Sequence, residues 1–244
     1  MIRSTRFFAA ACLCAASASP AFALDEIYSP NAEPGELSLE YNASRTFDSH
    51  SAKNNAQTHE IALEYGANDW LTVEASGGFE KDPDSALRLV DGQLEARAQF
   101  TQPGQYWLDS GLLVAYGFST QSHTADALEI KLLLQKDIGK FTTTANIGFE
   151  QEVGQYHAGG PDYAFLVNTR YRYNEYFQPG IELQSDLGAG RVLGHFNQQE
   201  HYLGPAVYGE LFDHVKYQVA WLAGVSDASA QSAARVLVEY EMHF

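Results

Sequence analysis

Residues 234–244 read ARVLVEYEMHF, and apolar and polar side chains alternate along this stretch. Successive side chains of a β-strand point to opposite faces, so a period of two predicts a strand with one apolar and one polar face. The stretch YWLDSGLLVAYGF, residues 106–118, repeats the pattern with Leu112, Val114 and Tyr116 on its apolar face. Both stretches therefore predict strands that separate two different environments.

The same period of two runs through twelve segments of the chain. They are residues 36–47, 58–67, 69–80, 90–101, 105–119, 126–136, 140–152, 162–174, 176–188, 200–212, 214–226 and 233–244. Each is close to or above the roughly 9–11 residues that a tilted strand needs to cross a bilayer. An even strand number is typical of single-chain bacterial barrels. We therefore predict an all-β fold, an antiparallel transmembrane β-barrel of about 12 strands in an up-and-down meander.

Charged side chains fall almost entirely on the polar faces of these segments. We predict that the following residues line the lumen: Glu40, Glu64, Glu74, Glu95, Arg97, Asp109, Glu129, Lys131, Glu150, Arg170, Arg172, Glu182, Asp186, Lys216, Glu239 and Glu241. The one charge on the apolar faces is Arg45, near the end of a segment. A charge costs several kcal/mol on the lipid face of a barrel and little in a hydrated lumen, which explains the segregation.

A soluble β-sandwich shows the same alternation, with its apolar faces hidden in a core. Two features favour the barrel. Aromatic residues gather at the segment ends, as in the two aromatic girdles of a membrane barrel. The connections also alternate between short ones and longer polar ones, which is the pattern of short periplasmic turns and long outer loops.

The N-terminal residues predict export. Arg3 and Arg6 form a positive region, residues 7–18 are apolar, and residues 21–23 form an Ala-Phe-Ala cleavage site. We predict that residues 1–23 are a cleaved signal peptide, residues 24–35 a periplasmic segment and residues 36–244 a single transmembrane barrel. Both cysteines precede the cleavage site, so the mature chain has no disulfide.

The C-terminal stretch VLVEYEMHF resembles the targeting signal of outer-membrane proteins, which ends in an aromatic residue on an alternating last strand. The resemblance implies that Phe244 is a targeting residue, read by the barrel assembly machinery. It also implies an outer-membrane location, with outer-membrane lipid and lipopolysaccharide as partners.

A second resemblance is to the transporter-like family named "MetA pathway of phenol degradation". It rests on LSLEY (residues 37–41), HEIALEYGANDWLTVEASGGFE (residues 59–80) and HYLGPAVYGEL (residues 201–211). It implies an outer-membrane channel or transporter and transfers no site residue.

Net charge and motifs limit the chemistry. Removing the signal leaves 13 basic and 31 acidic residues, a net charge of −18, which excludes nucleic acid as a partner. Six histidines (His50, His59, His123, His157, His195 and His201) lie near the longer connections without the spacing of a metal motif. The His-x-Ser-Asn-Gly type motif of the twelve-stranded outer-membrane phospholipases is absent. We expect no metal, no cofactor and no enzymatic activity.

Three functions remain open at this point. The first is a narrow channel or transporter for small cationic or neutral solutes, because the lumen charges are mainly acidic. The second is a structural or interaction barrel whose lumen is closed by its own side chains. The third, an outer-membrane hydrolase, would need a nucleophile within hydrogen-bond reach of a base.

Overall fold

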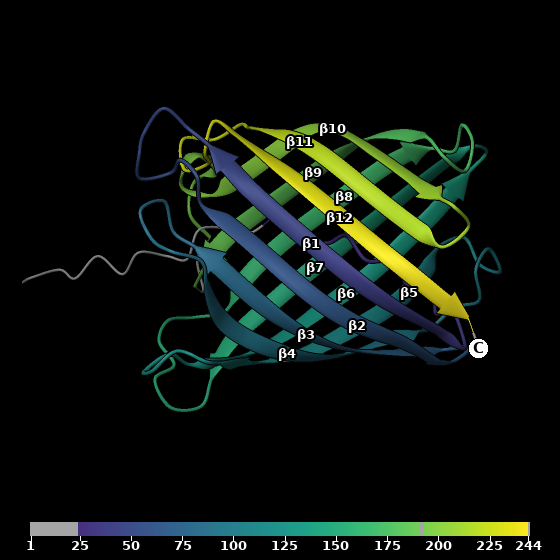
Figure 1. Cartoon of the computed structure of the whole chain (residues 1–244), viewed down its shortest axis with the longest axis horizontal. Helices are drawn as coiled ribbons and strands as arrows, with labels where there is room; N and C mark the ends of the chain where they lie inside the picture. Colours follow the sequence, from purple (N-terminus) through teal and green to yellow (C-terminus); the bar gives the residue numbers. More distant parts are fainter. Residues whose placement is uncertain (1–23, 191–192, 244) are drawn as a thin grey trace, which may run out of the picture.

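The described residues of the computed structural model, 24–190 and 193–243, form one closed barrel of antiparallel strands (Figure 1). The strands are β1 (Glu36–Phe47), β2 (Gln57–Asn68), β3 (Leu71–Lys81), β4 (Arg88–Gln99), β5 (Asp109–Ser119), β6 (Asp126–Ile138), β7 (Phe141–Val153), β8 (Asp162–Tyr171), β9 (Gln178–Ala189), β10 (Glu200–Leu211), β11 (Val215–Gly224) and β12 (Ser232–His243). A short 3₁₀ helix, η1 (Phe196–Gln198), precedes β10. The predicted twelve-stranded meander is confirmed. The signal peptide and Phe244 lie outside the described residues.

The barrel closes between its first and last strands. Twelve residue pairs join β1 to β12, from Glu36 opposite His243 to Phe47 opposite Ser232. In Figure 1 the two strands lie side by side at the front of the barrel, purple next to yellow. Closure removes both edges of the sheet, so strand backbone groups find partners within the sheet.

One strand begins later than its sequence pattern predicts. The alternation predicts a strand from residue 105, whereas β5 begins at Asp109. The Asp109 carboxylate accepts a hydrogen bond from the Gly104 N–H (2.8 Å), and the Thr101 hydroxyl accepts one from the Ser110 N–H (2.8 Å). Gly104 has a φ of 71°, which turns the chain. These local bonds hold residues 100–108 as a turn rather than as strand.

The outer face of the barrel is apolar. Along β1, Leu39 is 49% exposed and points outward, whereas Glu40 is 8% exposed and points inward. The same alternation leaves large apolar side chains exposed on every strand, including Ile61, Val73, Leu94, Val114, Leu132, Ile147, Phe165, Ile181, Leu203, Val219 and Val238. We call this surface the apolar belt. Arg45 lies on the outer face, and its guanidinium is 5.2 Å from the ring centre of Phe47 at the end of β1.

The described residues contain no helix that has both the length and the apolar character needed to cross a membrane.

The two ends of the barrel differ. The connections β1–β2, β3–β4 and the others that leave an odd-numbered strand form the long-loop end, and the remaining connections form the short-turn end (Figure 1). At the long-loop end, Lys53 Nζ donates hydrogen bonds to the carbonyls of Asp227 (2.8 Å) and Ala228 (2.7 Å). The Asp48 carboxylate accepts hydrogen bonds from the backbone N–H groups of His50 (2.6 Å) and Gln231 (3.0 Å). These bonds join the β1–β2 loop to the β11–β12 loop.

The hydrogen bond from the His50 N–H lowers the pKa of the Asp48 carboxyl. Because the pKa of Asp48 is lower in the folded than in the unfolded protein, its ionised carboxylate stabilises the loop junction at pH values above the unfolded pKa of about 3.9. This stabilisation is lost as the pH falls through the pKa of the folded protein. We expect amide-exchange protection in residues 48–54 and 227–231 to fall with pH below about 4. In Asp48→Asn the protection should fall at neutral pH by about threefold to tenfold, as for hydrogen bonds worth about 0.5–1.5 kcal/mol. Equal losses in Asp84→Asn, on the exposed β3–β4 loop, would contradict this role.

Candidate functional site: the barrel lumen

The lumen contains a segment of the chain itself. Residues 24–35, for which the sequence predicts a periplasmic location, run inside the barrel towards its short-turn end, where the Gly35 N–H donates to the Gly66 carbonyl (2.8 Å). Their backbone is held by carboxamide side chains of the barrel wall. The Tyr28 N–H donates to Asn146 Oδ1 (2.7 Å), and Asn146 Nδ2 donates back to the Tyr28 carbonyl (2.9 Å). The prediction of a periplasmic segment is therefore wrong for these residues. We call residues 24–35 the lumenal segment.

Gln184 forms a second clamp of the same kind two strands away, in the same row as Asn146 across β8. The Asp25 N–H donates to Gln184 Oε1 (2.8 Å), and Gln184 Nε2 donates to the Asp25 carbonyl (2.9 Å). A single bond, from the Ala32 N–H to Gln99 Oε1 (2.7 Å), fixes the segment further along. An extended backbone inside a barrel has no neighbouring strand, so these side chains satisfy groups that would otherwise remain unpaired.

Charged side chains hold the lumenal segment as well. Lys131 Nζ lies 2.5 Å from Asp25 Oδ2 and 3.0 Å from Glu129 Oε1. The Tyr28 ring lies between two cations, with Lys131 Nζ 5.2 Å and the Arg97 guanidinium 5.0 Å from its centre. The Lys131 side chain is buried, whereas the Asp25 side chain is 37% exposed, so their ion pair is partly open to solvent.

Inward-facing apolar residues complete the packing. Tyr28 forms a buried cluster with Leu113, Ala115 and Leu133. Leu24 forms a second cluster with the following wall residues: Tyr202, Ala206, Tyr208, Ala220, Leu222, Ala230 and Ala233. Leucines on the lumenal face are costly in a water-filled lumen and favourable beside an apolar segment. They are the signal from which the occupied lumen could have been inferred.

The structure brings several of the predicted lumen residues together. Arg97 contacts Glu64, and its Nε lies 3.4 Å from Glu95 Oε1. Glu74 lies between them in register, opposite Glu64 on β2 and Glu95 on β4. Two of these carboxylates, Glu64 and Glu95, thus share the Arg97 guanidinium, and Glu74 lies in the row between them.

A second group of predicted residues lies near the short-turn end. Lys216 contacts Glu241, and Glu239 lies opposite Lys216 in register and borders the main lumenal cavity together with Glu40. Arg170 stacks over the Tyr208 ring at 5.8 Å.

The remaining predicted residues lie nearer the ends of the barrel. Arg172 follows the end of β8 and binds Asp137 (2.5 Å) and the Gly139 carbonyl (2.6 Å) at the rim of the short-turn end. The Asp109 carboxylate accepts the hydrogen bond from the Gly104 N–H that holds the turn before β5. Towards the long-loop end, Glu150 lies opposite Asp162, and the Asp186 carboxylate accepts the Gly188 N–H (2.7 Å). These residues belong to the rims rather than to one shared site.

Arg235 is a lumen residue that the sequence analysis missed. Its Nη2 donates to Glu182 Oε2 (2.8 Å), and the two side chains are 1% and 0% exposed. Tyr208 Oη donates to the same Glu182 oxygen (2.9 Å), and Gln184 Nε2 donates to Glu182 Oε1 (2.7 Å). Arg235 has the same parity as Glu239, so the alternation on its strand was sufficient to find it. Glu36, Glu60 and Asp91 were missed in the same way.

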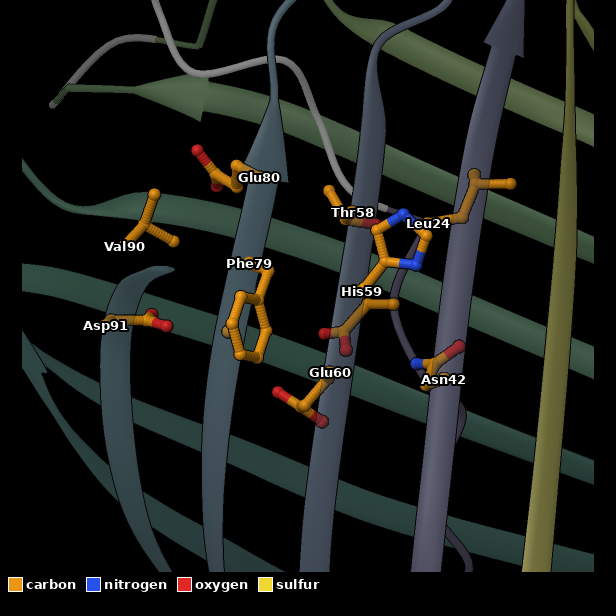
Figure 2. A pocket seen from close by; sticks show the side chains of 11 residues that line it. Leu24, Asn42, Thr58, His59, Glu60, Phe79, Glu80, Val90 and Asp91 are labelled. Atoms are coloured by element: carbon orange, nitrogen blue, oxygen red, sulfur yellow. The ribbon is translucent and has the colours of Figure 1, made fainter. Parts of the chain in front are cut away.

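Two cavities remain around the lumenal segment. The larger, of about 270 Å³, is bordered by six carboxylates and three cations: Glu26, Glu33, Glu36, Glu40, Glu64, Glu239, Arg97, Arg170 and Lys216. The smaller, of about 140 Å³, lies between Leu24, Asp25 and strands β1 to β4 (Figure 2). The lumenal segment therefore contributes side chains to both cavities and narrows the lumen.

One carboxylate cluster has the spacing of a cation site. Glu33, Glu36 and His243 each offer a ligand atom within 4.8 Å of the others, and Glu36 also groups with Glu239 and Glu241. However, His243 Nε2 lies 3.1 Å from Glu36 Oε2, and Lys216 Nζ lies 3.7 Å from Glu33 Oε1. Lys216 thus supplies a positive charge beside Glu33 and Glu241.

A serine–histidine pair lies on the outer face, away from the lumen. His201 Nδ1 is 2.9 Å from Ser185 Oγ, and His201 Nε2 is 3.2 Å from Gln199 Oε1. The Phe196 ring stacks on His201 with 4.2 Å between ring centres, and both Ser185 and His201 are buried. A nucleophile and its base must be open to the substrate, so this covered pair is a packing feature between β9 and β10.

Comparison with known proteins places the fold. No family model and no curated protein matches this chain. Solved structures do match. An outer membrane channel from Pseudomonas putida F1 has a TM-score of 0.65 and 12% identity, covering 88% of this chain and 98% of that one. The NanC porin has a TM-score of 0.60 and 10% identity, covering 84% and 100% of the two chains. The KdgM porin has a TM-score of 0.56 and 10% identity, covering 84% and 99%. The chain thus shares the barrel fold of these proteins.

The Asn146 clamp can be tested with a single introduced thiol, since residues 24–244 contain no cysteine. In Asn146→Leu the Tyr28 N–H and carbonyl lose their partners, at about 1–3 kcal/mol for each buried group. We expect Ser29→Cys, on the lumenal segment, to react at least tenfold faster with a small methanethiosulfonate reagent when Asn146→Leu is added.

Asn168→Leu is the matched control, because Asn168 lies on the lumenal face of β8 and its Oδ1 has no hydrogen-bond partner. An equal acceleration by the two changes would show that Asn146 has no specific role in holding the segment.

Proposed function

We propose that this protein is an outer-membrane channel for small solutes and that cationic or neutral solutes are favoured. The observation that carries the proposal is a closed barrel with the apolar belt outside and a charged, cavity-containing lumen inside. The polar interior of a membrane barrel forms a water-filled channel in porins, although it is plugged in other barrels. The similarity to solved barrels that are themselves named porins and channels supports the same function.

The apolar belt supports a location in a membrane. Soluble monomers rarely expose a continuous apolar patch larger than about 300–600 Å². Here exposed apolar side chains follow the outer face of every strand, while aromatic residues such as Trp70 and Phe141 lie near strand ends. The export signal and Phe244 extend the proposal to the outer membrane, with lipid, lipopolysaccharide and the assembly machinery as partners. Membership of the "MetA pathway of phenol degradation" family stays a prediction.

The charge of the larger cavity supports the preference for cations. Six carboxylates and three cations border it, so a solute there meets a negative surface. Fixed charges of one sign in a pore favour ions of the opposite sign. One of the similar structures is the KdgM porin in complex with disordered oligogalacturonate, a polyanion. The lumen of this chain is acidic, so it favours cations over polyanions of this kind.

A second function, a barrel with a closed lumen, is favoured by the lumenal segment. The segment is fixed in the lumen by hydrogen bonds and ion pairs to the wall. The two cavities described beside it are separate from each other. Planar-bilayer conductance of the refolded protein separates the two functions. A channel gives discrete current steps, and a closed barrel gives none even after the Asn146→Leu change.

Ion selectivity tests the role of the lumen acids. A unit charge about 4 Å from the ion path is worth about 1 kcal/mol in water, which corresponds to about a fivefold change in preference. We expect the wild-type protein to prefer K⁺ over Cl⁻ in reversal-potential measurements. Glu239→Gln, at the larger cavity, should reduce the ratio by up to about fivefold, whereas Asp84→Asn on an exposed loop should leave it nearly unchanged. Anion preference in the wild type would refute the proposed selectivity.

Neighbouring residues of β8 test the orientation of the barrel wall in the membrane. Val167 points outward, and Asn168 borders the larger cavity. Arginine at the bilayer midplane costs about 2–4 kcal/mol on the lipid face and little in the lumen. We expect Val167→Arg to reduce the heat-modifiable, folded form in outer membranes and Asn168→Arg to leave it near the wild-type level. If Val167→Arg were tolerated and Asn168→Arg reduced the folded form, Val167 would face the lumen and Asn168 the lipid. The assignment of lumen residues on β8 would then be wrong.

A further inference from the structure

Arg170 differs from the other two cations that border the larger cavity. Arg97 contacts Glu64, and Lys216 contacts Glu241. Arg170 forms neither an ion pair nor a hydrogen bond with any residue in the described ranges 24–190 and 193–243, and its Nε is buried without a partner. Buried charged groups are normally paired, so this guanidinium has donors available for a bound anion.

Two carboxylates on the strands around Arg170 are bound by other cations. Glu182 of β9 is bound by Arg235 (2.8 Å), and Asp137 of β6 is bound by Arg172 (2.5 Å). An exchange of partners would leave Arg235 or Arg172 without its carboxylate instead. The Arg170 guanidinium is therefore available to a solute.

The Arg170 side chain is positioned by an aromatic ring, which uses none of its N–H groups. Its guanidinium carbon lies 5.8 Å from the centre of the Tyr208 ring. Gly180 lies opposite Arg170 in register, and a Cβ at Gly180 would lie 3.1 Å from Tyr208 Cε2. The absence of a side chain there lets the ring approach the guanidinium. Stacking of this kind leaves the edge of the guanidinium free for two parallel hydrogen bonds to a carboxylate.

Asn168 supplies a second, independent observation on the same strand. Its side chain is 6% exposed and borders the larger cavity, and its Oδ1 has no hydrogen-bond partner. Its Nδ2 donates no hydrogen bond to the described part of the chain either. Buried amide groups are normally hydrogen-bonded. Because an amide both donates and accepts, this one can bind a carboxylate oxygen and an ammonium group at the same time.

The charges around the larger cavity are distributed asymmetrically. Its carboxylates come from the lumenal segment and from β12, β1 and β2: Glu26, Glu33, Glu239, Glu36, Glu40 and Glu64. The described lining residues from β6, β7 and β8 are Gln135, Thr144, Asn168 and Arg170, none of which is acidic. In the closed ring of strands β8 lies opposite β2. The cavity therefore has an acidic wall and, across from it, a wall with one free cation.

We propose that the larger cavity binds a small zwitterion, an amino acid that carries one carboxylate and one ammonium group. Arg170 and Asn168 Nδ2 bind the carboxylate, while Asn168 Oδ1 and the acids across the cavity attract the ammonium group. The inference rests on the proposed channel function and names the class of neutral solute that such a channel favours. A volume of about 270 Å³ accommodates a small amino acid with a few water molecules, each of which occupies about 30 Å³.

A solute with only one of the two charges fits the cavity less well. A monovalent anion can bind Arg170, but the surrounding carboxylates repel it. A cation is attracted by the same carboxylates and leaves the Arg170 guanidinium unpaired. A zwitterion has no net charge and presents a group of the matching sign to each wall.

The experiment measures binding to the purified protein in detergent by saturation-transfer NMR, with three probes of similar size. L-Alanine is a zwitterion, L-lactate carries only the carboxylate, and L-alaninamide carries only the ammonium group. We expect alanine to bind at least tenfold more tightly than lactate. Arg170→Gln should weaken alanine binding at least tenfold and should not weaken alaninamide binding, because loss of a cation does not reduce the attraction for another cation.

Arg172→Gln is the matched control, because Arg172 follows the same strand and is already bound to Asp137 at the rim. This change should leave alanine binding nearly unchanged. Arg170→Lys keeps the charge without the two parallel donors, so it should restore only part of the affinity. Asn168→Leu should also weaken alanine binding, and it provides a second variant if Arg170→Gln fails to give the folded, heat-modifiable form.

Absence of alanine binding to the wild type would overturn the proposal, as would lactate binding that equals alanine binding. Equal losses of alanine and alaninamide binding in Arg170→Gln would also overturn it, because they would indicate a structural role for Arg170. Liposome swelling in alanine tests the channel separately. Binding without swelling would refute transport and keep the zwitterion site, whereas swelling without binding would refute the site alone.

Discussion

The pairing of β1 with β12 is the constraint on which the rest of the structure depends. With the ends of the sheet joined, the strands have no exposed edge, and every side chain must face either the outside or the lumen. That division explains why Leu39 and Glu40 are neighbours in sequence and lie in opposite environments. It also explains why Arg45 is tolerated only near a strand end, beside the Phe47 ring.

Closure creates a second requirement inside the barrel. The lumenal segment carries backbone N–H and carbonyl groups but has no strand beside it, so the wall must provide their partners. Asn146 and Gln184 do so with two hydrogen bonds each, in the way that a neighbouring strand would. The inward leucines and Tyr28 add apolar contacts around these bonds. Together they make the segment part of the fold rather than an extension of it.

Three of the lumen cations are committed to particular acids. Lys131 binds Asp25 and Glu129, Arg97 binds Glu64 and Glu95, and Arg235 binds Glu182. The acids outnumber these cations, and the surplus carboxylates border the two cavities. The local excess of negative charge is thus a consequence of how few basic residues face inward.

Most of the barrel could be predicted from the sequence, because a period of two is a local property of neighbouring residues. The bounds of eleven strands and the inward or outward direction of their side chains follow closely from this period. The inward position of Arg235 could have been predicted in the same way. The start of β5 could not be predicted in this way, because the alternation continues into residues 105–108. Hydrogen bonds to the Asp109 carboxylate and the Thr101 hydroxyl hold the chain there as a turn. There a local hydrogen bond overrides the alternation.

The sequence by itself determined the strand count, the closed all-β architecture and the polar character of the lumen. Only the tertiary structure decided what fills that lumen. The clamps on residues 24–35 come from Asn146 and Gln184, which lie 118 and 159 positions away from their partners. No periodicity relates residues so far apart, because their contact depends on the curvature that brings β7 and β9 around the segment.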